Sequence, residues 1–210
     1  MTERSLIRMI VGLGNPGPEY EPTRHNAGFW LADLLAERHG GVFRAERKFG
    51  ADLASIRVDG ADVLLLKPQS FMNRSGGPVQ AAAAYLKIPV EQILVAHDDL
   101  DLPPGDVRLK QGGGHGGHNG LRNMVAHLGP GFWRLRLGIG HPGNRAEVID
   151  YVLQRPSRED DLLIRAAVSD AADVMPILLG GGEQPAMHKL HSRSVPPRPN
   201  RKDDGPAPAE

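Results

Sequence analysis

Short apolar runs alternate with amphipathic segments along this chain, and several apolar runs end in a polar loop. Apolar residues over 6–11, 93–96 and 107–110 predict strands, and helical spacing over 26–38, 121–128 and 162–179 predicts helices. Two more runs, 52–58 and 61–67, flank Asp59-Gly60 and predict a hairpin. Strands that alternate with helices predict a single-domain α/β sandwich around a mixed, mainly parallel twisted sheet with helices on both faces.

The boundaries of several elements rest on single residues. Asn26 is expected to cap the helix over 26–38, and Pro176 is expected to kink or end the helix over 162–179. Apolar and cationic residues alternate over 133–139, which predicts a strand with Arg134 and Arg136 on one face. Residues 194–210 are rich in proline and charge, so we expect a folded domain over 1–193 and a disordered tail over 194–210.

Composition narrows the picture mainly by exclusion. The chain has 25 Lys+Arg and 25 Asp+Glu, so its formal charge of zero does not by itself indicate nucleic acid, although a local basic patch can bind phosphate. With no cysteine, disulfides, thiolate metal sites and a cysteine nucleophile are excluded. No apolar run approaches the roughly 20 residues of a membrane helix, and the N-terminus does not resemble a signal peptide. We therefore expect a cytosolic protein without a membrane partner.

The loop after residues 6–11 contains a literal G-x-G-x-x-G at Gly12, Gly14 and Gly17. In a dinucleotide site the helix begins inside this motif, whereas here three prolines precede the helix expected from 26. A nucleotide cofactor is therefore a weak alternative, and we expect none. The chain also lacks G-x-S-x-G and H-E-x-x-H, so a hydrolase built on it must activate water directly with a base.

His25 is the best candidate for that base, because imidazole accepts protons near neutral pH. Asp98 and Asp99 follow the apolar run 93–96, and either carboxylate can orient His25 from the same sheet edge. These acids with His115 and His118 also suggest a metal site. His-x-x-His on a glycine-rich loop is a poorly preorganised ligand set, so we expect no metal.

The polar loops also contain candidate binding groups. Six glycines lie between 112 and 120, and they let backbone N–H groups approach a ligand closely. Asn15, Asn73 and Asn119 each offer an amide donor and acceptor, while Tyr20 and Phe71 suit stacking on a base or ribose. Candidate phosphate contacts are the cations Lys110, Arg134, Arg136, Arg44, Arg47 and Lys48.

Five stretches together resemble the bacterial-type peptidyl-tRNA hydrolase family. They are VGLGNPGPEYEPTRHNAGFW, KPQSFMNRSG, LVAHDDLDLPPG, GGGHGGHNGL and LRLGIGHPG, in the family's order and spacing. The resemblance covers most of residues 6–193. It implies a cytoplasmic, metal-free, monomeric enzyme that hydrolyses the ester between a peptide and the 3′ ribose of tRNA and recycles the tRNA.

The resemblance also implies roles for individual residues. His25 matches the base that activates water, Asp98 the acid that orients it, and Asn15 the residue that distinguishes N-blocked from free aminoacyl groups. The family's contacts with the substrate and the acceptor end of tRNA are matched by Tyr20, Phe71, Asn73 and Asn119. The cations that bind the 5′ phosphate of tRNA in the family are matched by Lys110 and Arg136. Two further hypotheses stay open at this point: a non-catalytic RNA-binding module, and a metal-dependent hydrolase built on residues 97–118.

Overall fold

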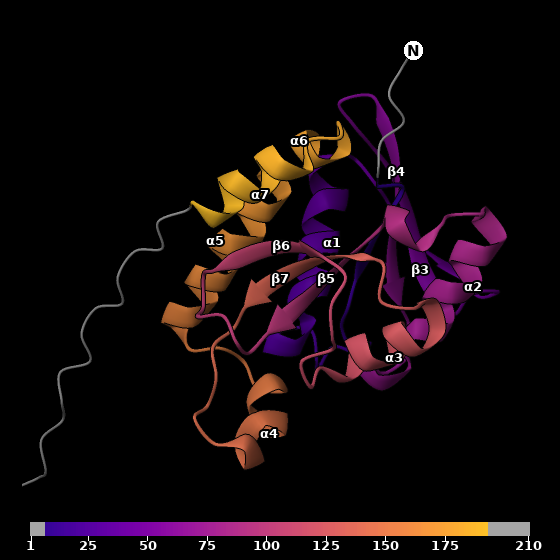
Figure 1. Ribbon diagram of the computed structural model, residues 1–210. Coiled ribbons are helices and arrows are strands. Elements are labelled where there is room, and N and C mark those ends of the chain that lie inside the picture. The colour runs from indigo at the N-terminus through magenta and orange to yellow at the C-terminus, as the bar shows by residue number, and fades with distance from the viewer. Residues whose placement is uncertain (1–6, 193–210) are drawn as a thin grey trace, which may run out of the picture.

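The computed structural model describes residues 7–192, and within them the chain forms one mixed sheet with helices on both faces (Figure 1). The strand order is β2-β3-β4-β1-β5-β7-β6, so the first apolar run lies at the centre of the seven-stranded sheet. β4, β1, β5 and β7 run parallel, whereas β2, β3 and β6 pair antiparallel at the two sides. The strands are β1 (Met9–Gly12), β2 (Arg44–Glu46), β3 (Ala51–Val58), β4 (Ala61–Pro68), β5 (Ile93–Asp99), β6 (Val107–Gln111) and β7 (Trp133–Gly138).

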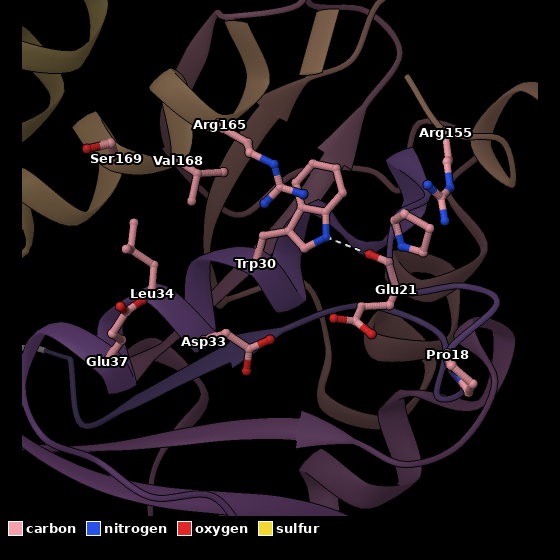
Figure 2. A pocket seen from close by; sticks show the side chains of 11 residues that line it. Pro18, Glu21, Trp30, Asp33, Leu34, Glu37, Arg155, Arg165, Val168 and Ser169 are labelled. Atoms are coloured by element: carbon pink, nitrogen blue, oxygen red, sulfur yellow. Dashed lines mark hydrogen bonds between the residues drawn. The ribbon is translucent and has the colours of Figure 1, made fainter. Parts of the chain in front are cut away.

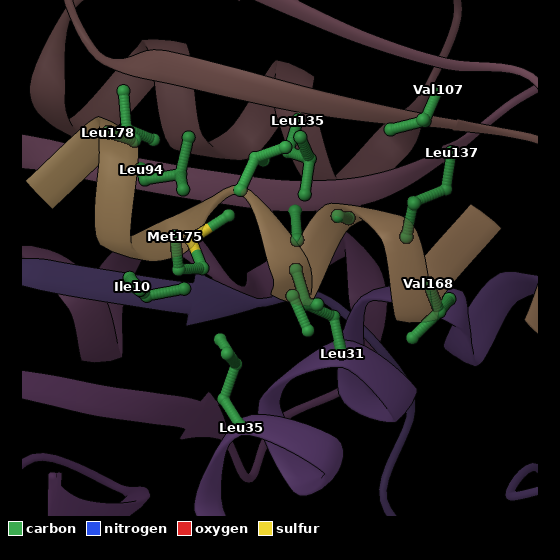
Figure 3. Packing of buried hydrophobic residues seen from close by; sticks show 14 of the residues in the cluster. Ile10, Leu31, Leu35, Leu94, Val107, Leu135, Leu137, Val168, Met175 and Leu178 are labelled. Atoms are coloured by element: carbon green, nitrogen blue, oxygen red, sulfur yellow. The ribbon is translucent and has the colours of Figure 1, made fainter. Parts of the chain in front are cut away.

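All the described helices except α4 divide between two layers, and each layer covers its own hydrophobic core. Ile10 of β1 and Leu94 of β5 pack under α1 and α5, where Leu31 and Val168 meet them (Figure 3). On the opposite face a second core forms under α2 and α3. The helices are α1 (Ala27–Arg38), α2 (Gly76–Leu86), α3 (Asn119–Leu128), α4 (Val148–Val152), α5 (Arg158–Asp173), α6 (Met175–Leu179) and α7 (Glu183–His191).

The predicted α/β class and the predicted hairpin are confirmed. Asp59 and Gly60 both have positive φ, 46° and 88°, as a two-residue hairpin turn requires, and β3 and β4 pair along their whole length. The helix expected over 162–179 is in fact two helices, because α5 ends at Asp173 and α6 begins at Met175, just before Pro176. The tail predicted over 194–210 lies outside the described residues.

One predicted local role is wrong. Asn26 stands at the N-cap position of α1, but its side chain makes no capping hydrogen bond there. Instead its Oδ1 accepts from the backbone N–H of Asn15 at 2.9 Å, and its Nδ2 donates to the Asn15 carbonyl at 3.0 Å. The amide therefore fastens the loop after β1 to the start of α1.

Over residues 7–192, no helix is long and apolar enough to cross a membrane.

Candidate active site

A cavity of about 1100 Å³ opens where the central parallel strands end. In open α/β sheets, ligands bind at the carboxyl ends of the strands, because the connecting loops meet there. The structure brings most of the predicted site residues together: the cavity is lined by Asn15, Tyr20, His25, Phe71, Asn73, Asp98, Lys110, Asn119 and Arg136, among others. The predicted cations Arg44, Arg47 and Lys48 do not line it.

His25 and Asp98 form a buried pair at the base of this cavity. His25 lies in a 3-10 turn, Arg24–Asn26, and its Nδ1 is 3.0 Å from each carboxylate oxygen of Asp98 at the end of β5. Since a carboxylate only accepts, Nδ1 carries the hydrogen and Nε2 keeps its lone pair. Burial lowers the pKa of His25, but the charge and hydrogen bond of Asp98 outweigh it, so the pKa is raised from its ordinary value.

A second histidine holds the same carboxylate. His118 Nε2 lies 2.9 Å from Asp98 Oδ1, while His118 Nδ1 accepts the backbone N–H of Leu121 at 3.2 Å and so caps α3. The cap fixes the tautomer, because the nitrogen that accepts from Leu121 cannot carry a proton. Burial would raise the pKa of Asp98, but His25 and His118 together hold it well below its usual range.

His97 completes a group of three imidazoles around Asp98. It is buried beside His118, with ring centroids 5.2 Å apart, and its Nδ1 donates to the Asp98 carbonyl at 2.7 Å. Burial, the largest cause, lowers the pKa of His97 to about 4. The ring is therefore neutral near pH 7, and it adds no positive charge to the site.

His25, Asp98 and His118 place their ligand atoms within 4.8 Å of one another, which is close enough for a metal ion. The hydrogen bonds of His118 oppose this use. A metal at Nε2 requires a lone pair there, so the proton must move to Nδ1 and the bond from Leu121 must break. His115, which the sequence suggested as a partner ligand, instead accepts from the backbone N–H of Gly117 at 3.1 Å.

Hydrogen bonds to neighbouring residues fix the orientation of Asn15. Its Oδ1 accepts the backbone N–H of Met72 at 2.7 Å, and Asn26 holds its backbone from the other side. Because a backbone N–H must face an oxygen, the amide orientation is fixed. Asn15 therefore offers Nδ2, a hydrogen-bond donor, to a ligand in the cavity.

The predicted cations differ in what they can contact. Lys110 is exposed at the cavity, and Arg136 lies there with its Nε donating to Asp99 at 2.7 Å. Arg134, by contrast, is buried, and its guanidinium donates to the carbonyls of Gly113 and Gly114. The expectation that Arg134 contacts phosphate is therefore replaced by a structural role: it anchors the glycine-rich loop.

A second hollow, of about 620 Å³, lies between α1 and α5, beside Pro18 and Glu21 of the loop after β1 (Figure 2). Trp30 lies at its centre, where the indole N–H donates to the Glu21 carbonyl at 2.8 Å and the Arg165 guanidinium packs over the ring at 4.3 Å. None of the predicted site residues lines this hollow. Trp30 thus acts as a buried anchor for the loop that leads to His25.

Known proteins match this chain in sequence and in fold. A sequence model of the family described as peptidyl-tRNA hydrolase matches residues 9–198. The chain belongs to this family. Peptidyl-tRNA hydrolase from Halorhodospira halophila is 55% identical over 187 residues, covering 89% of this chain and 96% of the relative. A second relative with the same name, from Methylobacillus flagellatus, is 55% identical over 190 residues, covering 90% and 98%.

A solved structure gives the same result for the fold. The crystal structure of peptidyl-tRNA hydrolase from Acinetobacter baumannii superposes with a TM-score of 0.87 at 45% identity, covering 90% of this chain and 97% of that one. The likeness extends over nearly the whole of both chains, so the two proteins share one fold.

Sequence reasoning missed two functional features of the site. It assigned His118 only to a possible metal site, because the helix was expected from 121, whereas α3 begins at Asn119 and has His118 as its N-cap. It also offered Asp99 only as an alternative partner for His25, whereas Asp99 holds Arg136. The His118–Asp98 and Asp99–Arg136 contacts do not follow from spacing along the chain, because each joins segments that are distant in sequence.

Proposed function

We propose that this protein hydrolyses peptidyl-tRNA, the reaction of its family, with His25 as the general base. The observation that carries the assignment of the base is the buried His25–Asp98 pair, in which Nδ1 donates to the carboxylate and Nε2 keeps its lone pair beside a large cavity. Peptidyl-tRNA carries an ester between the peptide carboxyl and the 3′ oxygen of the terminal ribose. A positioned water and one base are enough chemistry to cleave it.

In the proposed reaction, His25 Nε2 takes a proton from water while the water oxygen attacks the ester carbonyl carbon. The carbonyl electrons move to oxygen and give a tetrahedral oxyanion. When the intermediate collapses, the bond to the ribose 3′ oxygen breaks, and the proton on His25 passes to that oxygen. The products are a free peptide carboxyl group and tRNA with its 3′ hydroxyl. Asp98 stabilises the imidazolium form of His25 between the two transfers.

Asn15 provides a physical basis for selecting N-blocked substrates. Its Nδ2 donor, fixed by the contact between Oδ1 and Met72, fits the carbonyl oxygen of an N-acyl group. A free aminoacyl group has an ammonium in this region and no carbonyl to accept the bond. Its positive charge also faces an N–H donor, so the mismatch costs a buried hydrogen bond.

We assign the rim of the cavity to the tRNA end. Tyr20 and Phe71 pack edge to face with centroids 6.1 Å apart, and this pair forms an aromatic corner against which a base or ribose can stack. Asn73, in the 3-10 turn Met72–Arg74, and Asn119, the first residue of α3, carry exposed amides. Lys110 and Arg136 are the cations assigned to phosphate, and Asp99 limits the positions that the Arg136 guanidinium can reach.

The decisive experiment compares His25→Ala with His115→Ala on N-acetylaminoacyl-tRNA in the presence of chelator. Removing a general base costs roughly 10²–10⁴-fold in rate, so His25→Ala should lose turnover and still bind tRNA. His115→Ala should stay within a few-fold of the parent protein, because the His115 ring accepts its hydrogen bond from its own loop, at Gly117, and does not bond to His25 or Asp98. Normal turnover by His25→Ala refutes the assigned base. If the parent protein loses its activity only when chelator is added, the metal hypothesis is favoured. If the parent protein binds tRNA without any turnover, the RNA-binding module is favoured.

We propose in addition that the protein works as a monomer in the cytoplasm, where aminoacylated tRNA is used. Sedimentation at working concentration and cell fractionation test these two points. A dimer that resists dilution, or recovery outside the cytoplasm, contradicts them.

A further inference from the structure

Large apolar side chains are exposed at one wall of the cavity. Ile149 and Leu153 are 67% and 38% exposed, and both line the same cavity as His25. They belong to α4 and the residue after it, together with the less exposed Val148 and Val152, which also line the cavity. The four residues 148, 149, 152 and 153 follow helical spacing and form one apolar ridge. Exposed aliphatic groups that gather beside a site mark a binding surface.

Arg24 holds the apolar ridge against the 3-10 turn Arg24–Asn26, which contains His25. Arg24, next to His25, is buried, and its Nη1 donates to the carbonyls of Tyr151, Gln154 and Arg155 at 3.1, 3.3 and 3.1 Å. A cation at these carbonyls satisfies the end of α4 that the helix itself leaves without partners. The Arg24 guanidinium also packs over the Tyr151 ring at 4.0 Å.

A second bond ties α4 to the sheet. The Tyr151 hydroxyl donates to the Ile139 carbonyl at 2.6 Å, just after β7. In Figure 1, α4 accordingly lies beyond the carboxyl ends of β5 and β7, apart from the two main helical layers. The apolar ridge thus has a fixed position relative to His25, so a ligand can bind it without the entropy cost of ordering a flexible segment.

We propose that the apolar ridge binds apolar side chains of the peptide part of the substrate, an inference that rests on the proposed function. Aliphatic groups offer neither hydrogen bonds nor a flat π face, which are the means by which proteins bind nucleotides. Side chains that can bind nucleotides in these ways line other parts of the same cavity: Tyr20, Phe71 and Lys110. The peptide is the part of the substrate that carries aliphatic surface, and covering it together with the ridge removes both from water.

The test uses one tRNA body acylated either with N-acetyl-leucine or with N-acetyl-glycine, so that only the side chain differs. In the double variant Ile149→Ser/Leu153→Ser, kcat/KM for the leucyl substrate should fall about tenfold, since part of a leucine side chain is no longer buried. The glycyl substrate should change less than about twofold, because it has no side chain to bury. The matched control is Leu162→Ser, because Leu162 on α5 is 66% exposed and does not line the cavity.

Each result decides the question. An equal loss on both substrates means that the ridge contacts the tRNA end or only supports the fold, and it overturns the proposal. An unchanged ratio of the two kcat/KM values overturns it as well. Ile149→Ala, a milder change at an exposed position, should lower the same ratio in the same direction. If the parent protein turns over neither substrate, the proposed function fails instead, and the two failures are distinguishable.

Discussion

Replacing Asp98 by asparagine keeps the shape of the side chain and exchanges one acceptor oxygen for a donor. Two imidazoles depend on that carboxylate: His25 through Nδ1 at 3.0 Å and His118 through Nε2 at 2.9 Å. The tautomer of His118 is fixed by the Leu121 N–H at its other nitrogen, so it must donate to residue 98. The single oxygen of the amide is therefore drawn toward His118.

The amide nitrogen then takes the place of Oδ2, 3.0 Å from His25 Nδ1, although Oδ1 lies at the same distance. Where Nδ1 accepts from the amide nitrogen, the proton of the neutral ring moves to Nε2. The nitrogen that should receive a proton from water is thereby blocked. Asp98→Asn should lower kcat by roughly 10²–10⁴-fold, the range of a lost general base. The protein should remain folded, because the buried positions are still filled.

The assay is release of N-acetylaminoacyl groups from tRNA as a function of pH. In the parent protein, activity should rise as His25 loses its proton, through a pKa above 6.5, because Asp98 raises the pKa of His25. In Asp98→Asn the residual rate should lose this limb or move it to lower pH, since the negative charge is gone. An Asp98→Asn protein that keeps its rate within twofold would falsify the tautomer argument.

A second substitution tests the cause of the loss. Asparagine at position 118 can still cap α3, but its short side chain does not reach Asp98 as the imidazole does. Combining Asp98→Asn with His118→Asn frees the amide to rotate, so its oxygen can face His25 again. The double variant should therefore be more active than Asp98→Asn alone. If it is equally inactive, the loss comes from the missing charge rather than from the tautomer.

Two further predictions concern neighbouring residues. Asn15→Asp keeps the acceptor for Met72 but removes the Nδ2 donor, so the ratio of N-acetylaminoacyl to free aminoacyl hydrolysis should fall at least about tenfold; an unchanged ratio contradicts the role. His97 has an unfolded pKa near 6.5 and a folded pKa of about 4, so it should remove on the order of 3 kcal/mol from the free energy of unfolding as pH falls between these values. Denaturant melts should show that His97→Phe flattens this slope, and an identical slope would refute it.

The sequence predicts which residues meet because it shows where the strands end. Asn15 and Asp98 stand at or just after apolar runs that become adjacent parallel strands, β1 and β5, and such strands end at one edge. A polar loop after β4 adds Phe71 and Asn73. The meeting of these residues at one edge of the sheet therefore follows from the hydrophobic pattern and the strand topology, without any knowledge of side-chain contacts.

Contacts that involve a third partner cannot be predicted in this way. Alternation along β7 correctly places Arg134 and Arg136 on one face, yet one is buried under the glycine-rich loop and the other is paired with Asp99 at the cavity. Which of them faces a ligand depends on the path of a loop whose glycines impose little local preference. Asn26 likewise stands at a position typical of a helix cap, but its side chain bonds to the backbone of Asn15 instead of to the helix.

The three imidazoles around Asp98 are compatible with a strong base because two of them stay neutral. His118 donates to the carboxylate while its other nitrogen accepts from Leu121, and His97, with a pKa of about 4, donates to the Asp98 carbonyl. A positive charge on either ring would oppose protonation of His25 by repulsion. As neutral donors they fix the Asp98 carboxylate and leave its negative charge to the imidazolium that forms when His25 accepts a proton. The site thus gains orientation from His118 and His97 without weakening the base that it orients.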